Sequence, residues 1–172
     1  GDLREGSNLM DLNVKDISRR MLKNQWIETV RIDRIWPNSV SVHVTRRHPA
    51  ALIQCDQFLY VDARGKIIAP SNDKQMYNIP VFTSFNCPRP DEGSLSKALG
   101  LVNMFEKKKY KISEVNFSKD FGYTLYMADE PFPIILGESE FETKFQRFEK
   151  IYHYLKENKL VCASLDLNYS KK

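Results

Sequence analysis

The sequence lacks the features by which nucleotide-binding and membrane-spanning proteins are usually recognised. It has only seven glycines in 172 residues, and those at positions 65, 93, 100, 122 and 137 match neither a dinucleotide fingerprint nor a phosphate loop. No apolar run approaches the roughly 20 residues that a helix needs to cross a bilayer, and the polar start is unlike a signal peptide. We therefore expect no cofactor and no membrane span here. Because the chain begins with Gly, we also expect that preceding residues have been removed.

Cysteine and histidine are equally sparse. The three cysteines form no CxxC pair and the three histidines have no HExxH spacing, so we expect no metal site. Cys55 lies near a predicted strand end and Cys162 inside an alternating stretch, positions where cysteine usually acts as a small hydrophobic residue. A nucleophile at Cys87 or Cys162 with a nearby histidine stays open, since such partners are adjacent only in space. The general lack of site chemistry favours a binding or scaffolding module over an enzyme.

The charge is too small and too dispersed to indicate a ligand class. Lys and Arg number 26 against 22 Asp and Glu, a formal net charge of +4. The densest basic stretch, Lys107–Lys111, falls at the end of a predicted helix, where lysine interacts favourably with the helix dipole. We expect neither nucleic acid nor a small-molecule substrate. The hydrophobic fraction of 42% is ordinary for a folded protein.

Hydrophobic periodicity predicts an α+β fold, mainly an antiparallel sheet carrying two helices after an initial helix–hairpin unit. Helices are expected at Leu12–Lys23 with Asp11 as N-cap, from Ser94 as N-cap to no further than Tyr110, and at Glu140–Glu157, whose aromatic stripe is expected to be core. Strands are expected at Trp26–Ile35, Ser39–Arg46, Ala50–Gln54, Phe58–Asp62, Lys66–Ala69, Ile79–Ser84, Ile112–Lys119, Gly122–Ala128 and Pro133–Gly137.

The last predicted element, Val161–Ser170, has the most regular alternation in the sequence. Alternate residues from Val161 to Tyr169 are apolar, and those between them are mostly polar. This pattern predicts a strand buried on one face and solvated on the other. Because it comes last in the chain, we expect it at the edge of its sheet, where unpaired backbone groups can accept a partner strand.

Several phrases of the sequence, taken in order, carry a family resemblance. They are Asn24–Val44 with its Trp36-Pro37 pair, Arg46–Ala51, Leu59–Ile68, Ile79–Phe82, Tyr123–Tyr126, Ile135–Gly137, Lys144–Phe148 and Leu165–Tyr169. Their order and spacing over positions 6–170 resemble the FtsQ/DivIB family of bacterial division proteins. The chain departs from the family pattern at Arg46, usually acidic, and at Asn168, where the family has the Arg of "DlRY". Asp120 and Phe121 also replace residues that are often basic, with Lys119 the nearest substitute.

The resemblance implies two domains. Positions 1–49 would form a partial POTRA domain without its first strand and helix, and positions 50–172 an FtsQ-like β domain. Family members carry one N-terminal membrane helix, so the resemblance implies an inner-membrane protein at the division site, with this chain in the periplasm or extracytoplasmic space.

The resemblance also implies a non-enzymatic scaffold that links early and late division proteins at the septum. Its implied partners are FtsB/FtsL-like coiled-coil proteins, among other division proteins, bound by β-strand addition at the C-terminal edge. The expected partner-binding residues are Leu165, Leu167, Asn168, Tyr169, Ser170, Lys119 and Tyr123. Tyr169 is equally well interpreted as an aromatic residue at the rim of the core.

A second interpretation is a POTRA-bearing chaperone or translocation module for outer-membrane or secreted clients. Such a module would use the same edge pairing, usually with several POTRA units in tandem. Only one partial unit is visible in this sequence. The first interpretation is therefore favoured.

Overall fold

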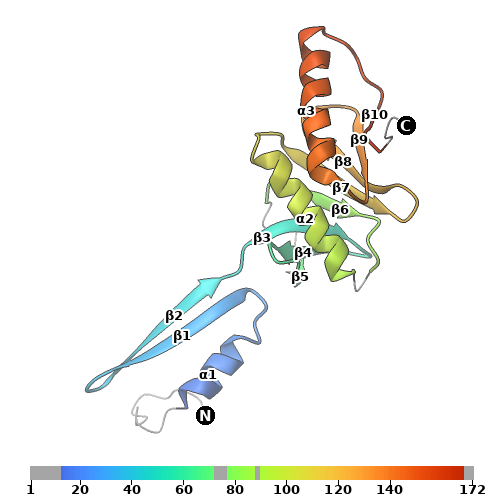
Figure 1. Ribbon diagram of the computed structural model, residues 1–172. Helices are drawn as coiled ribbons and strands as arrows, with labels where there is room; N and C mark the ends of the chain where they lie inside the picture. The colour runs from blue at the N-terminus through green and yellow to red at the C-terminus, as the bar shows by residue number, and fades with distance from the viewer. Residues whose placement is uncertain (1–12, 72–76, 88–89, 169–172) are drawn as a thin grey trace. The chain divides into compact units, whose positions relative to one another are not determined.

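The computed structural model describes residues 13–71, 77–87 and 90–168. The chain divides into an N-terminal unit, Gly1–His48, and a C-terminal unit, Pro49–Lys172. Figure 1 shows a helix and a hairpin in the first and a larger sheet with two helices in the second. The α+β class expected from the sequence is confirmed.

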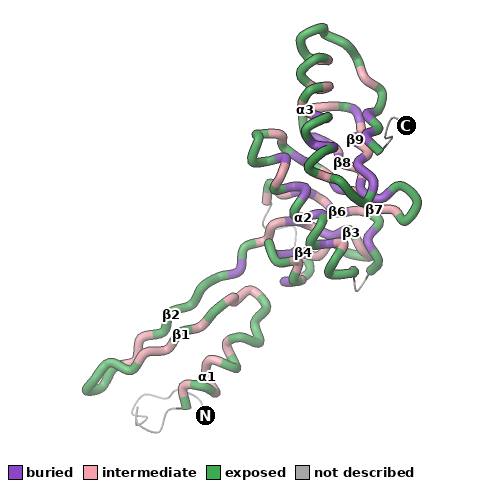
Figure 2. Tube along the Cα trace, in the orientation of Figure 1, coloured by how far each residue is buried: buried purple, intermediate pink, exposed green. Residues whose placement is uncertain are grey.

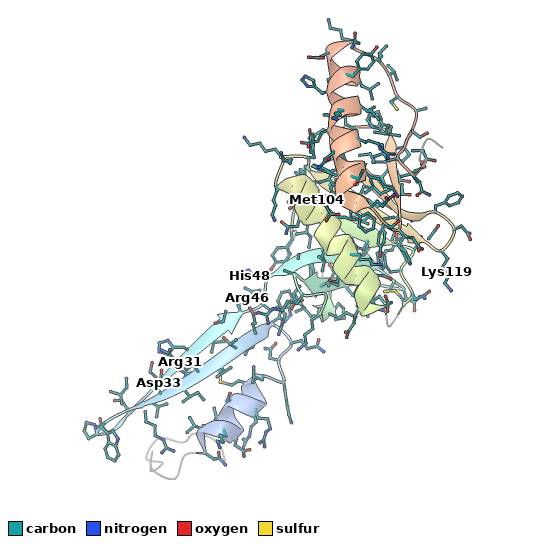
Figure 3. The ribbon with its side chains drawn as sticks, viewed as in Figure 1. Arg31, Asp33, Arg46, His48, Met104 and Lys119 are labelled. Atoms are coloured by element: carbon teal, nitrogen blue, oxygen red, sulfur yellow. A yellow bond between two sulfur atoms is a disulfide. The ribbon has the colours of Figure 1, made fainter. Side chains whose placement is uncertain are left out.

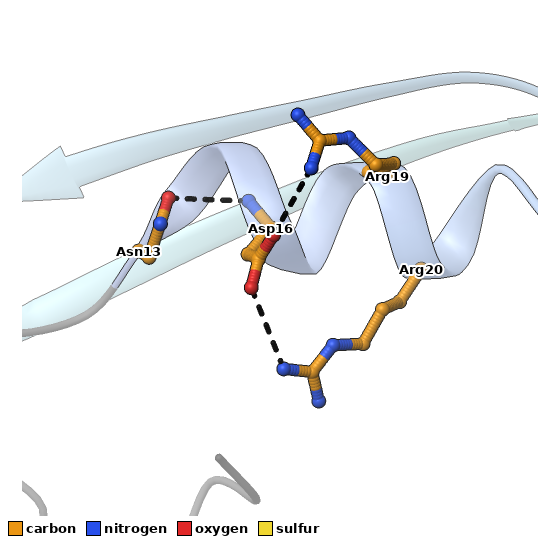
Figure 4. Close-up of polar contacts among 4 residues, drawn as sticks. All are labelled: Asn13, Asp16, Arg19 and Arg20. Atoms are coloured by element: carbon orange, nitrogen blue, oxygen red, sulfur yellow. Dashed lines mark hydrogen bonds and ion pairs between the residues drawn. The ribbon is translucent and has the colours of Figure 1, made fainter.

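The N-terminal unit contains α1 (Val14–Met21), β1 (Ile27–Ile35) and β2 (Ser39–Arg46), the two strands forming an antiparallel hairpin. The helix is shorter than predicted, and its N-cap is Asn13 rather than Asp11, which lies outside the described residues. The Asn13 side chain accepts a hydrogen bond from the Asp16 N–H at 3.2 Å. Figure 4 shows that bond together with the ion pairs of the Asp16 carboxylate with Arg19 (3.3 Å) and Arg20 (3.6 Å).

Burial in the N-terminal unit is shallow. The alternating valines of β2 are only partly covered, and Val42 and Val44 are nearly half exposed. Among the described residues of this unit only Arg47 is buried, and its guanidinium donates a hydrogen bond to the Gln25 carbonyl at 3.2 Å. In Figure 2 this unit is almost entirely coloured as intermediate or exposed. The helix and the two strands within residues 13–48 enclose no apolar core among themselves.

The C-terminal unit is built on an eight-stranded sheet with the order β10-β9-β8-β7-β6-β3-β4-β5. Its elements are β3 (Pro49–Gln54), β4 (Phe58–Asp62), β5 (Ile67–Pro70), β6 (Val81–Thr83), α2 (Glu92–Glu106), β7 (Ile112–Ser118), β8 (Gly122–Met127), β9 (Pro133–Gly137), α3 (Phe141–Glu157) and β10 (Leu165–Asp166). Four of the seven strand pairs in this described sheet are antiparallel.

Both helices of this unit pack on the sheet through one core. Phe105 of α2 is fully buried and lies 4.7 Å from the ring of Phe145 and 5.0 Å from that of Phe148, both from α3. The aromatic stripe of α3 is therefore core, as expected.

The α2 cap is Asp91, not Ser94: the Asp91 carboxylate accepts hydrogen bonds from the Ser94 N–H (2.7 Å) and hydroxyl (2.9 Å). These bonds lower the pKa of the Asp91 carboxyl.

A disulfide joins Cys55 to Cys87, with 5.7 Å between their Cα atoms. The expectation that Cys55 acts as a small hydrophobic residue is wrong. The sheet brings the two together because β3 ends just before Cys55 and pairs with β6, which is followed by the loop that carries Cys87. The described cysteine that remains free is Cys162.

The long strand predicted at Val161–Ser170 is also wrong in its extent. Only Leu165–Asp166 pairs in the described region, parallel to β9, and Val161 is 96% exposed. The residues before Leu165 complete the return from α3, where Lys159 has a positive φ and the Leu160 N–H donates to the Leu155 carbonyl at 3.0 Å. Apolar and polar residues do alternate from Val161, but pairing with β9 begins only at Leu165. Tyr169 and Ser170 lie outside the described residues.

Candidate protein-interaction edge

The described sheet ends at β10, and its outer side is the candidate site. The Leu167 N–H donates to the Ile135 carbonyl of β9 at 2.9 Å, and the side chains of Leu165 and Leu167 are 8% and 2% exposed. Because backbone groups of successive residues point to opposite sides of a strand, those of Asp166 point away from β9. The edge can thus offer a backbone donor and acceptor while its leucines stay in the core.

Asn168 lies just beyond β10 and is exposed. Its N–H donates to the Asp166 carboxylate at 2.8 Å, and its side-chain oxygen accepts from the Lys144 ammonium at 3.1 Å. The Asn168 N–H is therefore engaged within the chain, and the backbone donor offered to the open side is that of Asp166. Sequence reasoning singled out Asn168 and did not single out Asp166.

Tyr123 and Lys119 occupy different environments. Tyr123 is 1% exposed, its ring lies 4.8 Å from that of Phe117, and its hydroxyl donates to the Ser94 carbonyl at 3.1 Å. Its side chain therefore supports β8 from inside the core. Lys119 lies at the exposed turn between β7 and β8 (Figure 3). Pairing of Ser118 with Gly122, and of Gly122 with Gly137, places this turn at the same end of the sheet as Asn168.

A cavity of about 280 Å³ lies beside the same turn, lined in part by Phe85, Asp91, Ser94, Phe117 and Lys119. Its acidic group, the Asp91 carboxylate, already caps α2. Lys119 and the carboxylate contribute opposite charges, and the remaining lining residues are aromatic, amide or hydroxyl side chains. This composition suits polar surface contact and provides no activated nucleophile.

Two potential nucleophile arrangements can be assessed from the geometry. Cys87 is held in a disulfide, so it cannot serve as a thiolate. On the hairpin, Ser41 Oγ (3.1 Å) and Asp33 Oδ2 (3.8 Å) both approach the same ring nitrogen, Nε2 of His43. A serine triad needs them on opposite nitrogens. Figure 3 shows Asp33 beside Arg31, whose guanidinium donates to it at 2.9 Å. Within the described residues no group of three or more His, Cys, Asp or Glu is placed to hold a metal ion.

Lys144 is a second residue of this edge that sequence reasoning missed. It is 4% exposed and donates to the Leu136 carbonyl at 2.7 Å as well as to Asn168. The signal was present: Lys144 follows Phe141 by three residues and precedes Phe148 by four, so it falls on the apolar face of α3. A charged side chain on the apolar face of a helix is buried, so it needs hydrogen-bond acceptors inside the protein.

Comparisons with known proteins agree with this architecture. Residues 1–47 match the model of an FtsQ-type POTRA domain, and residues 51–168 match that of the C-terminal region of cell division protein FtsQ/DivIB. A POTRA-type helix–hairpin unit followed by a sheet domain defines the class. The chain belongs to the FtsQ/DivIB family of cell division proteins, which confirms the resemblance drawn from the sequence.

Curated relatives carry the same family name. The chain is 29% identical to cell division protein FtsQ of Geotalea daltonii, 26% to that of Syntrophotalea carbinolica and 27% to that of Geobacter sp. strain M21, in each case over 99% of its own length. It spans 64–66% of the length of these relatives. None of the described helices is long and apolar enough to cross a membrane.

Proposed function

We propose that the protein is a scaffold of the division machinery that binds an extended segment of an FtsB/FtsL-like partner by strand addition to β10. The observation that carries this proposal is the position of β10 at the sheet edge, with the Asp166 backbone groups directed outward. Main-chain hydrogen bonds would supply affinity, and the polar end formed by Asn168 and the turn at Lys119 would help to set the register. The family membership favours this role over a chaperone or translocation module.

The proposal includes an extracytoplasmic location for this chain, with the whole protein anchored in the inner membrane by an N-terminal helix. The Cys55–Cys87 disulfide supports that location because structural disulfides persist in oxidising compartments. We also propose that the two units correspond to the POTRA and β domains, since the family matches meet between residues 47 and 51.

The test is a titration with the purified extracytoplasmic part of the organism's FtsB-like protein. Asp166→Pro removes the outward N–H, leaves the Leu167 bond to β9 in place, and is compatible with an edge strand. We expect it to weaken binding by about tenfold or more, corresponding to roughly one ladder hydrogen bond and the local pairing around it. Removing positions 160–172 is a poorer test, because it also removes the buried Leu165 and Leu167.

The matched control is Asp166→Ala, which removes the same carboxylate and keeps the backbone N–H. It should bind more tightly than Asp166→Pro. Equal affinities for the two variants would show that the backbone donor contributes nothing, and the strand-addition proposal would then be wrong.

A further inference from the structure

Lys144 is a buried cation held by neutral acceptors. Its side chain is 4% exposed, and its ammonium donates to the carbonyl oxygen of Leu136 at 2.7 Å and to Asn168 Oδ1 at 3.1 Å. Burying a cation costs free energy unless hydrogen bonds compensate for the lost water. An apolar side chain of similar length would fill this position without that cost. The charge therefore matters through the two groups that it holds.

Those two groups belong to neighbouring segments of the sheet. Leu136 lies in β9, whereas Asn168 follows β10, and the described ladder between these strands is only two residue pairs long. The bond from the Leu167 N–H to the Ile135 carbonyl is the last of that ladder before Asn168. Lys144 thus ties the chain to β9 and α3 at the point where the described pairing with β9 ends.

Gly137 makes room for this arrangement. It has a φ of +71°, and a Cβ on it would lie 2.3 Å from Asn168 Oδ1. A side chain at position 137 would displace the Asn168 amide from the ammonium of Lys144. The close approach of β9 and the C-terminal segment therefore depends on the missing side chain as well as on the lysine.

We infer that Lys144 is a positioning residue for the interaction edge. By holding Asn168 against β9, it fixes the direction in which the Asp166 backbone groups are offered to an added strand. Its own side chain is buried, so it acts through Asn168 rather than through contact with a partner. The part of this inference that concerns binding rests on the proposed function; the part that concerns the edge does not.

The edge is tested by hydrogen exchange on the protein without any partner. In Lys144→Met we expect the Leu167 amide to exchange about tenfold faster, because local opening of the edge becomes easier, while amides of the central strand β8 keep their protection. Lys150→Met removes an exposed lysine from the same helix and should leave Leu167 unchanged. Unchanged Leu167 exchange in Lys144→Met would overturn the inference.

A second variant changes the effect in the opposite direction. Asn168→Asp places a carboxylate opposite the ammonium, so the attraction between two full charges is added to a hydrogen bond in which only the donor was charged. Leu167 exchange should therefore slow by several-fold in Asn168→Asp, and the slowing should disappear in the double variant with Lys144→Met. A general packing role for Lys144 predicts no such dependence. Exchange in Asn168→Asp as fast as in the original protein would also overturn the inference.

Binding of the FtsB-like protein separates the inference from the proposed function. We expect Lys144→Met to bind about tenfold more weakly, in line with the greater opening of its edge. If the exchange effects occur but the original protein binds nothing, the proposed function fails and the positioning role stands. If Lys144→Met binds as tightly as the original protein despite faster exchange at Leu167, the claim that positioning serves binding is overturned.

Discussion

The two units differ in how they keep their apolar residues from water. In the C-terminal unit, two helices and a sheet enclose Phe82, Phe105, Leu125 and Phe148 at 0% exposure. In the described part of the N-terminal unit, Val42 and Val44 are nearly half exposed and the one buried residue is an arginine. Regular secondary structure thus forms in both units, but as far as the structure describes them, the closed core belongs to the second. Hairpins packed on so little are marginally stable.

This contrast can be measured unit by unit. Both tryptophans, Trp26 and Trp36, belong to the N-terminal unit, so tryptophan fluorescence follows that unit during denaturant unfolding. Far-UV circular dichroism is dominated by the larger C-terminal unit. Coincidence or separation of the two transitions is the standard test of two-state behaviour.

The largest effect is expected from Phe105→Ala. This substitution removes a ring packed against Phe145 and Phe148 and leaves a cavity, a change that typically costs about 3–5 kcal/mol. The transition followed by circular dichroism should move to much lower denaturant, while the fluorescence transition should barely change. Val44→Ala is the control in the other unit, and it should cost well under about 1 kcal/mol because that side chain is already half exposed. If the two substitutions lowered the free energy of unfolding by similar amounts, the two units would not differ in how well their cores are closed.

A somewhat smaller effect is expected from opening the disulfide. Cys55 and Cys87 are 32 positions apart, and a closed loop of that length stabilises by about 3–4 kcal/mol in the chain-entropy model. The double variant Cys55→Ser/Cys87→Ser should lower the stability of the C-terminal unit by that order. Cys162→Ser, which alters the free cysteine, serves as the control and should have little effect. If reductant destabilises the double variant as much as the original protein, the Cys55–Cys87 disulfide is not the source of the stability that reductant removes.

The smallest effect is expected from Glu130, whose carboxylate accepts a hydrogen bond from Tyr152 at 2.7 Å and pairs with Lys156. Burial raises the pKa of Glu130, but the hydrogen bonds from Lys156 and Tyr152 outweigh it and the net pKa is lowered. A lowered folded-state pKa stabilises the fold above the unfolded value, near 4.5, and the contribution is lost as pH falls through the folded value.

Glu130→Gln keeps an acceptor oxygen but removes its charge, so it should cost about 1 kcal/mol at pH 7, roughly the difference between hydrogen bonds to charged and to neutral groups. The difference from the original protein should shrink as the pH falls below about 4.5, measured by urea unfolding at several pH values. A difference that stays constant from pH 7 to pH 3 would show that ionisation of Glu130 does not contribute. At every pH, the substitution should leave the unfolding transition followed by tryptophan fluorescence where it is in the original protein.

Sequence reasoning succeeded where the signal is local. The hairpin around Pro37, the strands from Ile112 to Gly137 and the aromatic face of α3 all follow from periodicity and turn residues, and the structure has them within a few positions. The helix caps were less accurate, because neighbouring residues compete for the same role. At α2 both Asp91 and Ser94 can cap, and the backbone resolves the choice by making Ser94 the donor.

Reasoning failed where the answer depends on a neighbour distant in sequence. The alternation from Val161 onward predicts a strand, yet a strand also needs a partner in register, and β9 supplies one only from Leu165. The Cys55–Cys87 bond likewise depends on β3 and β6 lying side by side. At the candidate edge Leu165, Leu167 and Asn168 were anticipated, but Asp166 and Lys144 were found only from the backbone direction and the buried contacts.

The shortness of β10 bears on how the protein avoids its own copies. Exposed edge strands invite pairing between identical molecules, and natural proteins often limit this by keeping such strands short or charged. In the described region β10 is two residues long, and one of them, Asp166, is acidic. Two copies that met edge to edge would gain few hydrogen bonds and would bring two carboxylates together. The same edge can thus remain available to a foreign strand that brings its own length and charge, while resisting self-association.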